Sequence, residues 1–161
     1  MKLFHIFVLK RIEIMDEIYN PDWRFAKMTQ TEIENHVKVR SFVLLSQQHM
    51  IPESSGKKIK FRVTEKDIEH LVADALHRAK GKLYISDIST LPQYFNSAKF
   101  IETTKDTKTG NKKVWFHYYN ITIGERLLYL NIKEDKLRKT IRLHSITSII
   151  KTTAAVKQQS L

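Results

Sequence analysis

The chain lacks cysteine altogether, and it contains only 4 glycines and 3 prolines among 161 residues. The absence of cysteine excludes disulfides, thiolate metal sites and a cysteine nucleophile. It is also compatible with a reducing compartment, so we expect a cytoplasmic protein. Because glycine and proline interrupt helices and strands, their scarcity predicts that much of the chain lies in regular elements.

Long apolar runs are missing as well. A helix that spans a membrane needs about 20 apolar residues in a row, and the sequence has no such run. The uninterrupted apolar run at residues 6–9 is shorter than the roughly 7–15 residues of a signal-peptide core. We therefore predict a buried strand or the start of a helix at this position, and no membrane partner.

Positive charge is in excess. The formal net charge is +11; residues 105–142 hold 10 basic against 4 acidic side chains, and residues 35–63 hold 6 against 1. An excess concentrated in two segments favours a polyanionic partner. No basic amphipathic helix with a broad apolar face stands out, so nucleic acid is favoured over an anionic membrane. Solvated lysines without a partner would give the same count.

A helix at residues 65–80 is the clearest element. Thr64 is a good N-cap, Asp67 three residues later is close to a capping box, and Gly81 supplies the stop. One apolar stripe runs along the helix at the spacing of a helical face. Its members are Ile68, Leu71, Val72, Ala75, Leu76 and Ala79. We expect this stripe to pack against a sheet.

Strand patterns lie on both sides of this helix. Alternating side chains predict a strand at residues 37–45, which would pair with residues 58–63 as a hairpin. Downstream, Pro92 starts a short helix. Four strand patterns then follow one another, at residues 99–103, 114–122, 126–133 and 139–150. Because short connections join them, we predict an antiparallel meander.

These elements predict the α+β class, with helices packed on one face of a four-stranded antiparallel β-meander and an N-terminal β-containing extension. No internal repeat or low-complexity segment divides the chain further. We expect the extension with its β-hairpin at residues 1–63, an α+β domain at residues 64–150 and a flexible tail at residues 151–161.

Alternation along the strands divides the predicted sheet into two faces. The core side is expected to carry Leu128, Leu130, Ile132, Ile141 and Leu143. The open side is expected to carry Trp115, His117, Tyr119, Tyr129, Asn131, Thr140, Arg142 and His144. Aromatic rings interleaved with cations suit single-stranded nucleic acid, because bases stack on rings and phosphates bind cations. Ordinary strand aromatics on a solvated face are the alternative.

Residues of the open side could support RNA cleavage without a metal ion. The 2′-hydroxyl attacks the neighbouring phosphate when one group removes its proton and another protonates the leaving oxygen. A cation must also stabilise the charged phosphorane. His117, His144 and Arg142 meet these needs, and His77 with Arg78 at the end of the helix could approach them.

Metal-dependent chemistry has weaker support. The sequence contains no H-E-x-x-H, G-x-S-x-G or Walker A motif, and no carboxylate cluster typical of two-metal nucleases. His70, Asp74 and His77 share one face of the predicted helix and could bind a metal ion. Their spacing alone is poor support for a tetrahedral site, so we expect neither a metal nor another cofactor.

Three short motifs resemble a known group of nucleases. They are His77 in the helix, the turn with Ser86-Asp87-Ile88 and Leu91-Pro92, and Leu143-His144-Ser145-Ile146-Thr147 in the last strand. Over residues 65–150 the chain resembles the phage and mobile-element nuclease domains of the barnase–EndoU–colicin–RelE superfamily. The resemblance implies a metal-independent, toxin-like endoribonuclease. Its catalytic residues would be His77, Arg142, His144, Ser145 and Thr147.

The expected RNA contacts extend beyond the catalytic residues. They are Trp115, Tyr119, Tyr129, Arg78, Lys113 and Arg126. The resembling domains carry a basic residue on the central strand, and Lys113, His117 and Arg126 compete for that position here. Beside RNA, an acidic immunity or antitoxin protein is the partner that a toxin-like nuclease implies.

Two other interpretations stay open. The first is a non-catalytic nucleic-acid-binding or accessory domain of a mobile element, which would keep the fold without the activity. The second is a structural protein whose basic face binds an acidic partner. Toxicity on expression separates the nuclease from both, and a steep loss of nucleic acid affinity with salt separates the first alternative from the second.

Overall fold

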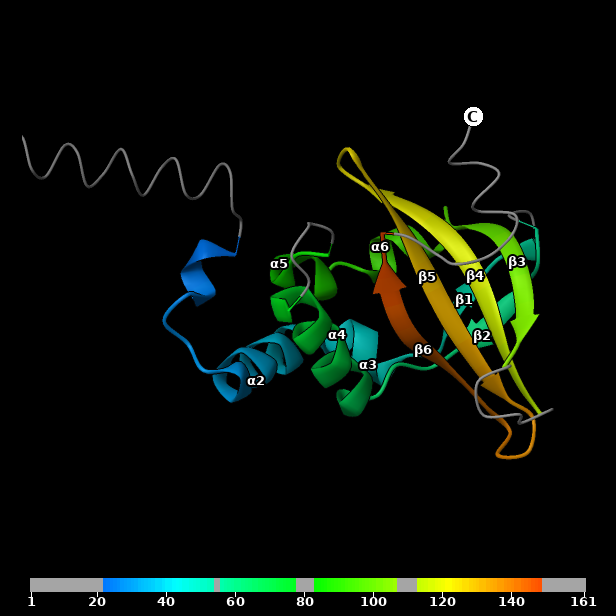
Figure 1. Ribbon diagram of the computed structural model, residues 1–161, viewed down its shortest axis with the longest axis horizontal. Coiled ribbons are helices and arrows are strands. Elements are labelled where there is room, and N and C mark those ends of the chain that lie inside the picture. Colours follow the sequence, from blue (N-terminus) through cyan, green and yellow to red (C-terminus); the bar gives the residue numbers. More distant parts are fainter. Residues whose placement is uncertain (1–21, 54–55, 78–82, 107–112, 149–161) are drawn as a thin grey trace, which may run out of the picture.

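The structure is a computed structural model that describes residues 22–53, 56–77, 83–106 and 113–148. Its helices are η1 (Trp23–Phe25), α2 (Gln30–Arg40), α3 (Phe42–Ser46), α4 (Glu65–His77), α5 (Ile85–Ile88) and α6 (Pro92–Phe95). Its strands are β1 (His49–Ile51), β2 (Ile59–Phe61), β3 (Lys99–Lys105), β4 (Val114–Ile123), β5 (Arg126–Asp135) and β6 (Thr140–Thr147). The predicted α+β class is confirmed (Figure 1). Within the described ranges, every helix is too short or too polar to span a membrane.

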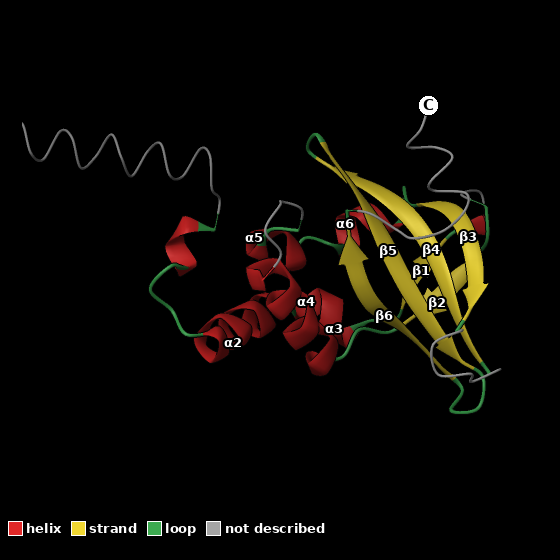
Figure 2. Ribbon diagram, viewed as in Figure 1, coloured by secondary structure: helices red, strands yellow, loops and turns green. Residues whose placement is uncertain are grey.

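The four-stranded antiparallel meander is also confirmed. β3, β4, β5 and β6 lie side by side in sequence order, and each pairs antiparallel with the next. Gly124 turns β4 into β5 with a φ of 62°, a left-handed conformation that glycine adopts without strain. β3 forms one edge of the sheet and contains a register shift at Ile101. Figure 2 shows the long strands of this sheet together with the short strands β1 and β2.

The predicted strand at residues 37–45 is wrong, because α2 and α3 occupy this segment. The side chain of Thr29 caps α2 by accepting a hydrogen bond from a backbone N–H of the first turn at 3.2 Å. Ile33 and Val37, four residues apart, are buried on one helical face, whereas Val39 is 78% exposed. The period-2 alternation is therefore incidental, and the cap with the i, i+4 spacing determines the structure.

A hairpin forms near the predicted place, but β1 is its first strand and pairs antiparallel with β2. Beyond β2, the N–H of Arg62 donates to the carbonyl of Ile141 at 3.1 Å, next to a parallel bridge with β6. On the other side of the sheet, a Cβ on Gly56 would lie 2.6 Å from the Cβ of Phe100 in β3. The hairpin segment therefore approaches both edge strands of the larger sheet.

Helix α4 begins at the predicted cap. Thr64 and Asp67 cap each other: the Asp67 N–H donates to Oγ1 of Thr64 at 3.2 Å, and the Thr64 N–H donates to Oδ2 of Asp67 at 2.8 Å. The helix is described as far as His77, and residues 78–80 of the predicted helix lie outside the described residues. The capping signal thus fixes the start of α4.

The apolar stripe of α4 is buried along most of its length. Ile68, Leu71 and Val72 are buried in the core, and Ala75 packs against it. Leu76 is 40% exposed, so its predicted burial is wrong. At 3.6 residues per turn, Leu76 lies about 80° around the helix from Ile68, at the margin of the stripe.

One core joins the helices, the hairpin and the sheet. It contains side chains from both sides of the predicted boundary at residue 63, including Ile33, Leu44, Ile51, Phe61, Leu71, Leu91 and Leu130. The predicted core side of the sheet is confirmed for Leu128, Leu130, Ile132 and Leu143, and Ile141 packs against this core. α4 contacts β6, and α6 contacts β1 and β4. Figure 1 shows α2, α4 and α5 gathered on the β6 side of the sheet.

The two sides of β4 are the reverse of the prediction. His117 and Tyr119 pair directly with Ile132 and Leu130 of β5, and cross-strand partners share a face. Both side chains are buried on the core side, so their predicted place on the open side is wrong. Their polar atoms have partners inside the protein, as in the hydrogen bond of 2.9 Å from the Tyr119 hydroxyl to the carbonyl oxygen of Lys57. These hydrogen bonds offset the free-energy cost of burying the polar groups.

A β-bulge interrupts β6 at His144. Leu143 and Ser145 pair with consecutive residues of β5, which leaves His144 as an extra residue. The alternation reverses beyond this point, so Ser145 shares the outer side with Asn131 while Ile146 is buried in the core. Simple alternation continued from Leu143 would place Ser145 inward and Ile146 outward, the reverse of what the bulge produces.

Replacement of Leu71 by alanine should destabilise the protein by about 2–5 kcal/mol, because the removed side chain is fully buried and leaves a cavity. Urea unfolding followed by circular dichroism measures this change. Leu76→Ala on the same helix is the matched control and should cost less than about 1 kcal/mol, since surface positions tolerate substitution. Equal losses in the two variants would place Leu71 outside the core.

Candidate functional site

The outer face of the sheet, opposite the core, brings polar side chains into two rows. The first row consists of successive cross-strand partners, Glu102, Tyr118, Asn131 and Ser145. The second row consists of Thr104, Phe116, Lys133 and Arg142. Cross-strand partners have their Cβ atoms only about 4.5–5.5 Å apart. These two rows and His144 therefore form one surface, which we name the outer-face site.

His144 reaches this surface from the edge strand β6. Its ring centroid lies 5.6 Å from that of Phe116 on β4. The side chain therefore extends across β5, which separates the two strands. The imidazole also stays exposed to solvent, so a ligand can reach it.

The surroundings of His144 lower its pKa. Partial desolvation is the main cause, and the positive charges of Lys133 and His70 act in the same direction. Asp67 and Asp74 on α4 oppose this shift. His144 is therefore largely neutral at pH 7, and a neutral imidazole can accept a proton. The same interactions place His70 of α4 within electrostatic range of the outer-face site.

Lys133 and Arg142 are direct cross-strand partners on this face. Like charges in such positions repel each other. Neither residue forms an ion pair with another residue of the described ranges. Arg62 adds a third cation to the same edge through its backbone bridge to Arg142. A bound anion would offset the repulsion, and the planar fork of arginine suits a phosphate group.

Two buried oxygen atoms in the first row lack a hydrogen-bond partner. They are Oε2 of Glu102 and Oδ1 of Asn131, counted over the part of the chain that the structure describes. Tyr118 stands between them; burial raises the pKa of its hydroxyl, a hydrogen bond with Thr104 opposes the shift, and the Glu102 charge adds to it. Buried polar atoms without partners cost free energy and require an explanation. Binding of a polar ligand to this row is one such explanation.

Four of the six predicted catalytic residues share the outer face. Arg142 and His144 belong to the outer-face site, and the pairings of Ser145 with Asn131 and of Thr147 with Tyr129 place both on the same side. His77 lies apart from them, exposed in the last turn of α4. The structure therefore brings together the residues of the last strand and not the helix residue.

His117 belongs to a separate, buried cluster on the core side. Its Nδ1 lies 2.7 Å from Oγ1 of Thr103, and its Nε2 lies 2.8 Å from Oε1 of Glu134. The Nζ of Lys57 lies 3.4 Å from the same Nδ1. Burial lowers the pKa of His117, although Glu134 pulls in the other direction. His117 thus joins the hairpin segment to the sheet and does not meet His144.

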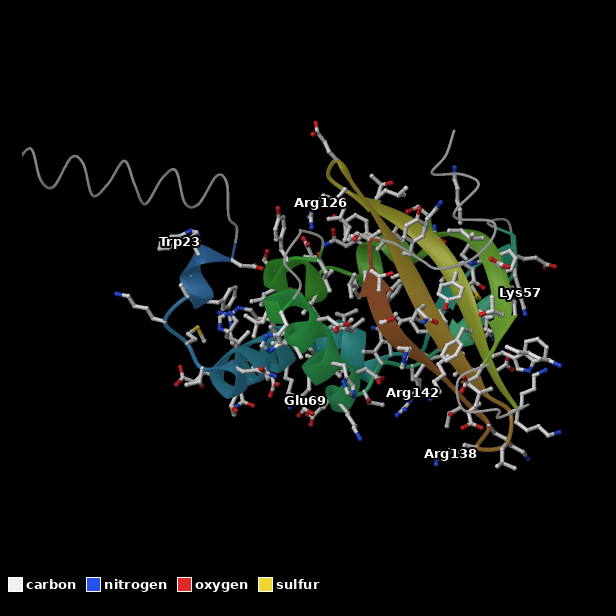
Figure 3. All side chains as sticks on the ribbon, viewed as in Figure 1. Trp23, Lys57, Glu69, Arg126, Arg138 and Arg142 are labelled. Atoms are coloured by element: carbon white, nitrogen blue, oxygen red, sulfur yellow. The ribbon has the colours of Figure 1, made fainter. Side chains whose placement is uncertain are left out.

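The predicted nucleic acid contacts are dispersed. Tyr129 is buried on the outer side beside Ile101 and Tyr118, while Tyr119 is in the core. Arg126 lies at the other end of β5 from the partner of Arg142 (Figure 3). Its guanidinium donates to both oxygens of Asp87, at 2.7 and 3.2 Å, and stacks 4.0 Å from the centre of the Tyr84 ring. Tyr129 and Arg126 therefore have structural roles.

Trp115, Lys113 and Arg78 complete this set. Trp115 pairs with Glu134 on the same side of the sheet as His117, so its predicted place on the open side is wrong. The Nζ atoms of Lys105 and Lys136 lie 4.8 and 4.9 Å from its ring centre. Lys113 is exposed just before β4. Arg78 lies outside the described residues. A nucleobase stacking on Trp115 would take the place of one of these lysines.

Sequence reasoning missed three residues near the outer-face site. The first is Glu102, the only acidic residue in β3. The second is Lys133, which lies two residues after Asn131 on the polar side of β5. The third is His70, which the sequence suggested only as a metal ligand. The alternating pattern of β3 and β5 contains this signal once the strand register is known. As for the metal alternative, no group of three His, Asp or Glu residues in the described ranges is arranged to hold a metal ion.

Comparisons with known proteins do not point to a relative. No protein-family model, no curated protein and no solved structure matches the chain. The resemblance to the barnase–EndoU–colicin–RelE superfamily rests on short motifs, and it stays a prediction.

Proposed function

We propose that the protein is an endoribonuclease that cleaves RNA at the outer-face site. The observation that carries this proposal is an exposed imidazole, His144, beside the like-charged pair Lys133 and Arg142, on a surface that lowers the pKa of the imidazole. Cleavage of RNA by its own 2′-hydroxyl needs a proton acceptor and a cationic site for the phosphate. The proton acceptor and the cations belong to the paired strands β5 and β6, and paired strands hold side chains in fixed positions.

In the proposed reaction, His144 accepts the proton of a ribose 2′-hydroxyl while the 2′-oxygen attacks the adjacent phosphorus. Arg142 binds two phosphoryl oxygens, and Lys133 adds positive charge, so that the phosphorane is stabilised. The bond from phosphorus to the 5′-oxygen of the next nucleotide then breaks. The products are a 2′,3′-cyclic phosphate and a free 5′-hydroxyl.

The leaving 5′-oxygen must receive a proton, and we assign this step to Tyr118. Its hydroxyl keeps its proton because burial raises its pKa. Tyr118 lies two residues along β4 from Phe116, against which the His144 ring packs. Two residues of a strand span about 7 Å, a gap that a phosphodiester can bridge. Thr104, which hydrogen-bonds with Tyr118, would position the hydroxyl.

The wider biological role is part of the same proposal. The toxin-like activity, the phage or mobile-element setting and an acidic immunity or antitoxin partner are supported by the motif resemblance alone. The cytoplasmic location is supported by the absence of cysteine.

A nucleic-acid-binding module without catalysis is the second candidate. It is favoured by Trp115 on the core side of β4, whose ring lies 4.8 and 4.9 Å from the Nζ atoms of Lys105 and Lys136. Rings and cations together bind single strands by stacking and charge, and this requires no proton transfer.

The purified protein should cleave single-stranded RNA in excess chelator and leave DNA of the same sequence intact, because the nucleophile is the 2′-hydroxyl. His144→Ala and Arg142→Ala should each lower the rate by about 10²–10³-fold, measured on end-labelled RNA. His77→Ala and Arg138→Ala are matched controls outside the outer-face site and should leave the rate unchanged. Loss of activity in His77→Ala alone would move the active site to the end of α4, and intact RNA would favour the binding module.

The pH dependence of kcat/KM should report His144. Only the neutral imidazole accepts a proton, and its pKa is lowered, so activity should fall toward acid pH with a midpoint below about 6.5. Lys133→Gln removes a nearby positive charge and should move this midpoint to higher pH. An acid limb that does not respond to Lys133→Gln would show that another group titrates.

RNA binding should depend strongly on salt. In the His144→Ala protein, the logarithm of the binding constant should fall linearly with the logarithm of salt concentration, by about 0.7 for each phosphate contact on a single strand. Lys133→Gln should reduce the magnitude of this slope by about one contact. Lys27→Gln removes the same charge between η1 and α2 and should leave the slope unchanged. Fluorescence anisotropy of a labelled RNA measures the slope for each variant. Undetectable binding at low salt would favour an acidic protein partner.

A further inference from the structure

A cavity lies between η1, α2 and α5. Its volume is about 540 Å³, within the roughly 300–1,000 Å³ typical of small-molecule sites. Its apolar lining is part of the core, since Val37 and Ile85 are buried core residues and Phe25 and Met28 pack against that core. One side of the cavity is therefore apolar and held in place by the core.

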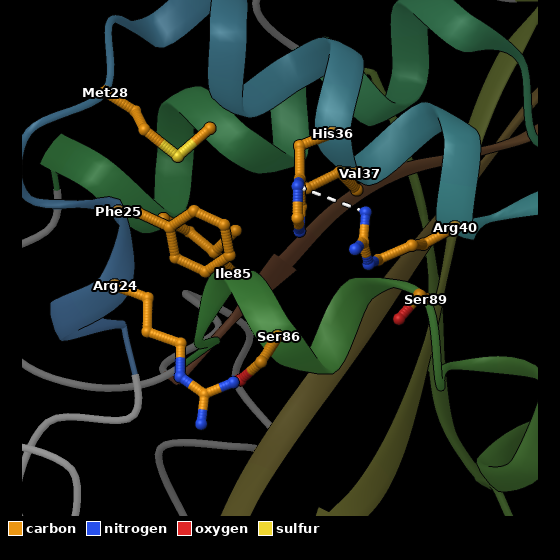
Figure 4. A pocket seen from close by; sticks show the side chains of 9 residues that line it. All are labelled: Arg24, Phe25, Met28, His36, Val37, Arg40, Ile85, Ser86 and Ser89. Carbon is orange, nitrogen blue, oxygen red and sulfur yellow. Dashed lines mark hydrogen bonds between the residues drawn. The ribbon is translucent and has the colours of Figure 1, made fainter.

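The polar lining is basic. Arg24 and Arg40 line the cavity together with His36, Ser86 and Ser89, and none of the lining side chains is acidic. Figure 4 shows the two arginine side chains coming from different elements, with Ser86 between them in this view. Guanidinium groups bind phosphate by charge-assisted hydrogen bonds. Serine hydroxyls both donate and accept, so they suit ribose and base atoms.

Existing hydrogen bonds hold both basic walls in place. The Asp22 carboxylate accepts hydrogen bonds from the N–H groups of Ile85 and Ser86, at 2.7 and 3.3 Å. This contact fixes the start of η1, and with it Arg24, against α5. On the other wall, Nη1 of Arg40 donates to Nδ1 of His36 at 3.1 Å. A preformed site of this kind loses little entropy when it binds a ligand.

We propose that this cavity binds a mononucleotide, with the phosphate between Arg24 and Arg40 and the base against Phe25. The shape of the site favours a nucleotide over a simple anion, because a phosphate ion alone would leave the apolar side uncovered. Phe25 offers a ring on which a base can stack, and its edge contact with the His36 ring, with centroids 5.2 Å apart, holds it in place. This site is separate from the outer-face site, and the inference does not depend on RNA cleavage.

The test is titration calorimetry of the full chain with adenosine 5′-monophosphate. Adenosine, which lacks the phosphate, and inorganic phosphate, which lacks the base, should each bind at least about tenfold more weakly. Arg24→Gln and Arg40→Gln should each weaken binding of the monophosphate by at least about tenfold, because each removes a hydrogen-bonding cation. Arg138→Gln removes the same charge at the turn before β6 and should leave the affinity unchanged (Figure 3).

Two controls test whether the variants fold and whether the nucleotide binds in this cavity. Arg24 and Arg40 are both exposed, so their variants should keep the melting temperature of the parent protein. The double variant His144→Ala, Arg142→Ala should bind the monophosphate as tightly as the parent. Loss of binding in that double variant, with full binding in Arg40→Gln, would place the nucleotide at the outer-face site and overturn the proposal. Equal affinity for phosphate and monophosphate, or no binding at millimolar concentration, would overturn it as well.

Discussion

The apolar side of β5 determines what the sheet can offer to a ligand. Leu128, Leu130 and Ile132 occupy alternate positions, and burial of each side chain of this size contributes roughly 1.5–3 kcal/mol. Because these three residues face the core, the residues between them face outward. Asn131 thus reaches the outer face together with Lys133, the next residue after the apolar set. The polar outer-face site is therefore a consequence of packing on the opposite side of the sheet.

The same packing places two polar side chains of β4, His117 and Tyr119, in the core. The hairpin segment provides polar contacts for both. A tyrosine hydroxyl without a partner in an apolar interior costs free energy. Lys57 meets this need for Tyr119 through its backbone carbonyl, and its ammonium group lies near His117. The sheet and the hairpin segment therefore depend on each other: without the contact from Lys57, the inward register of β4 would bury a tyrosine hydroxyl that has no partner.

Sequence patterns predicted the elements whose signals are local. The cap at Thr64 gave the start of α4, and alternation gave the meander and the core side of β5. The errors arose where distant residues decide the outcome. β4 carries apolar and aromatic residues on both sides, and its buried hydroxyl finds a partner in Lys57, far away in the sequence. The bulge at His144 is one extra residue, which alternation alone cannot reveal.

The candidate site was predicted in part for the same reason. Arg142 and His144 are close together in one strand, so their common face follows from local geometry. Lys133, Glu102 and His70 join them only through strand register and the position of α4. The cavity beside Arg24 and Arg40 depends on Asp22, which meets Ser86 from 64 residues away in the sequence. No local pattern contains that contact.

The β3 edge of the sheet has a consequence for how the protein behaves at high concentration. An exposed edge strand can add a strand from another molecule and begin aggregation. β3 begins and ends with lysine, at Lys99 and Lys105, and its register shifts at Ile101. Charge at both ends makes the edges of two copies repel each other, and the irregular backbone gives an incoming strand a poor template. Two copies of the protein that meet at this edge therefore remain separate molecules.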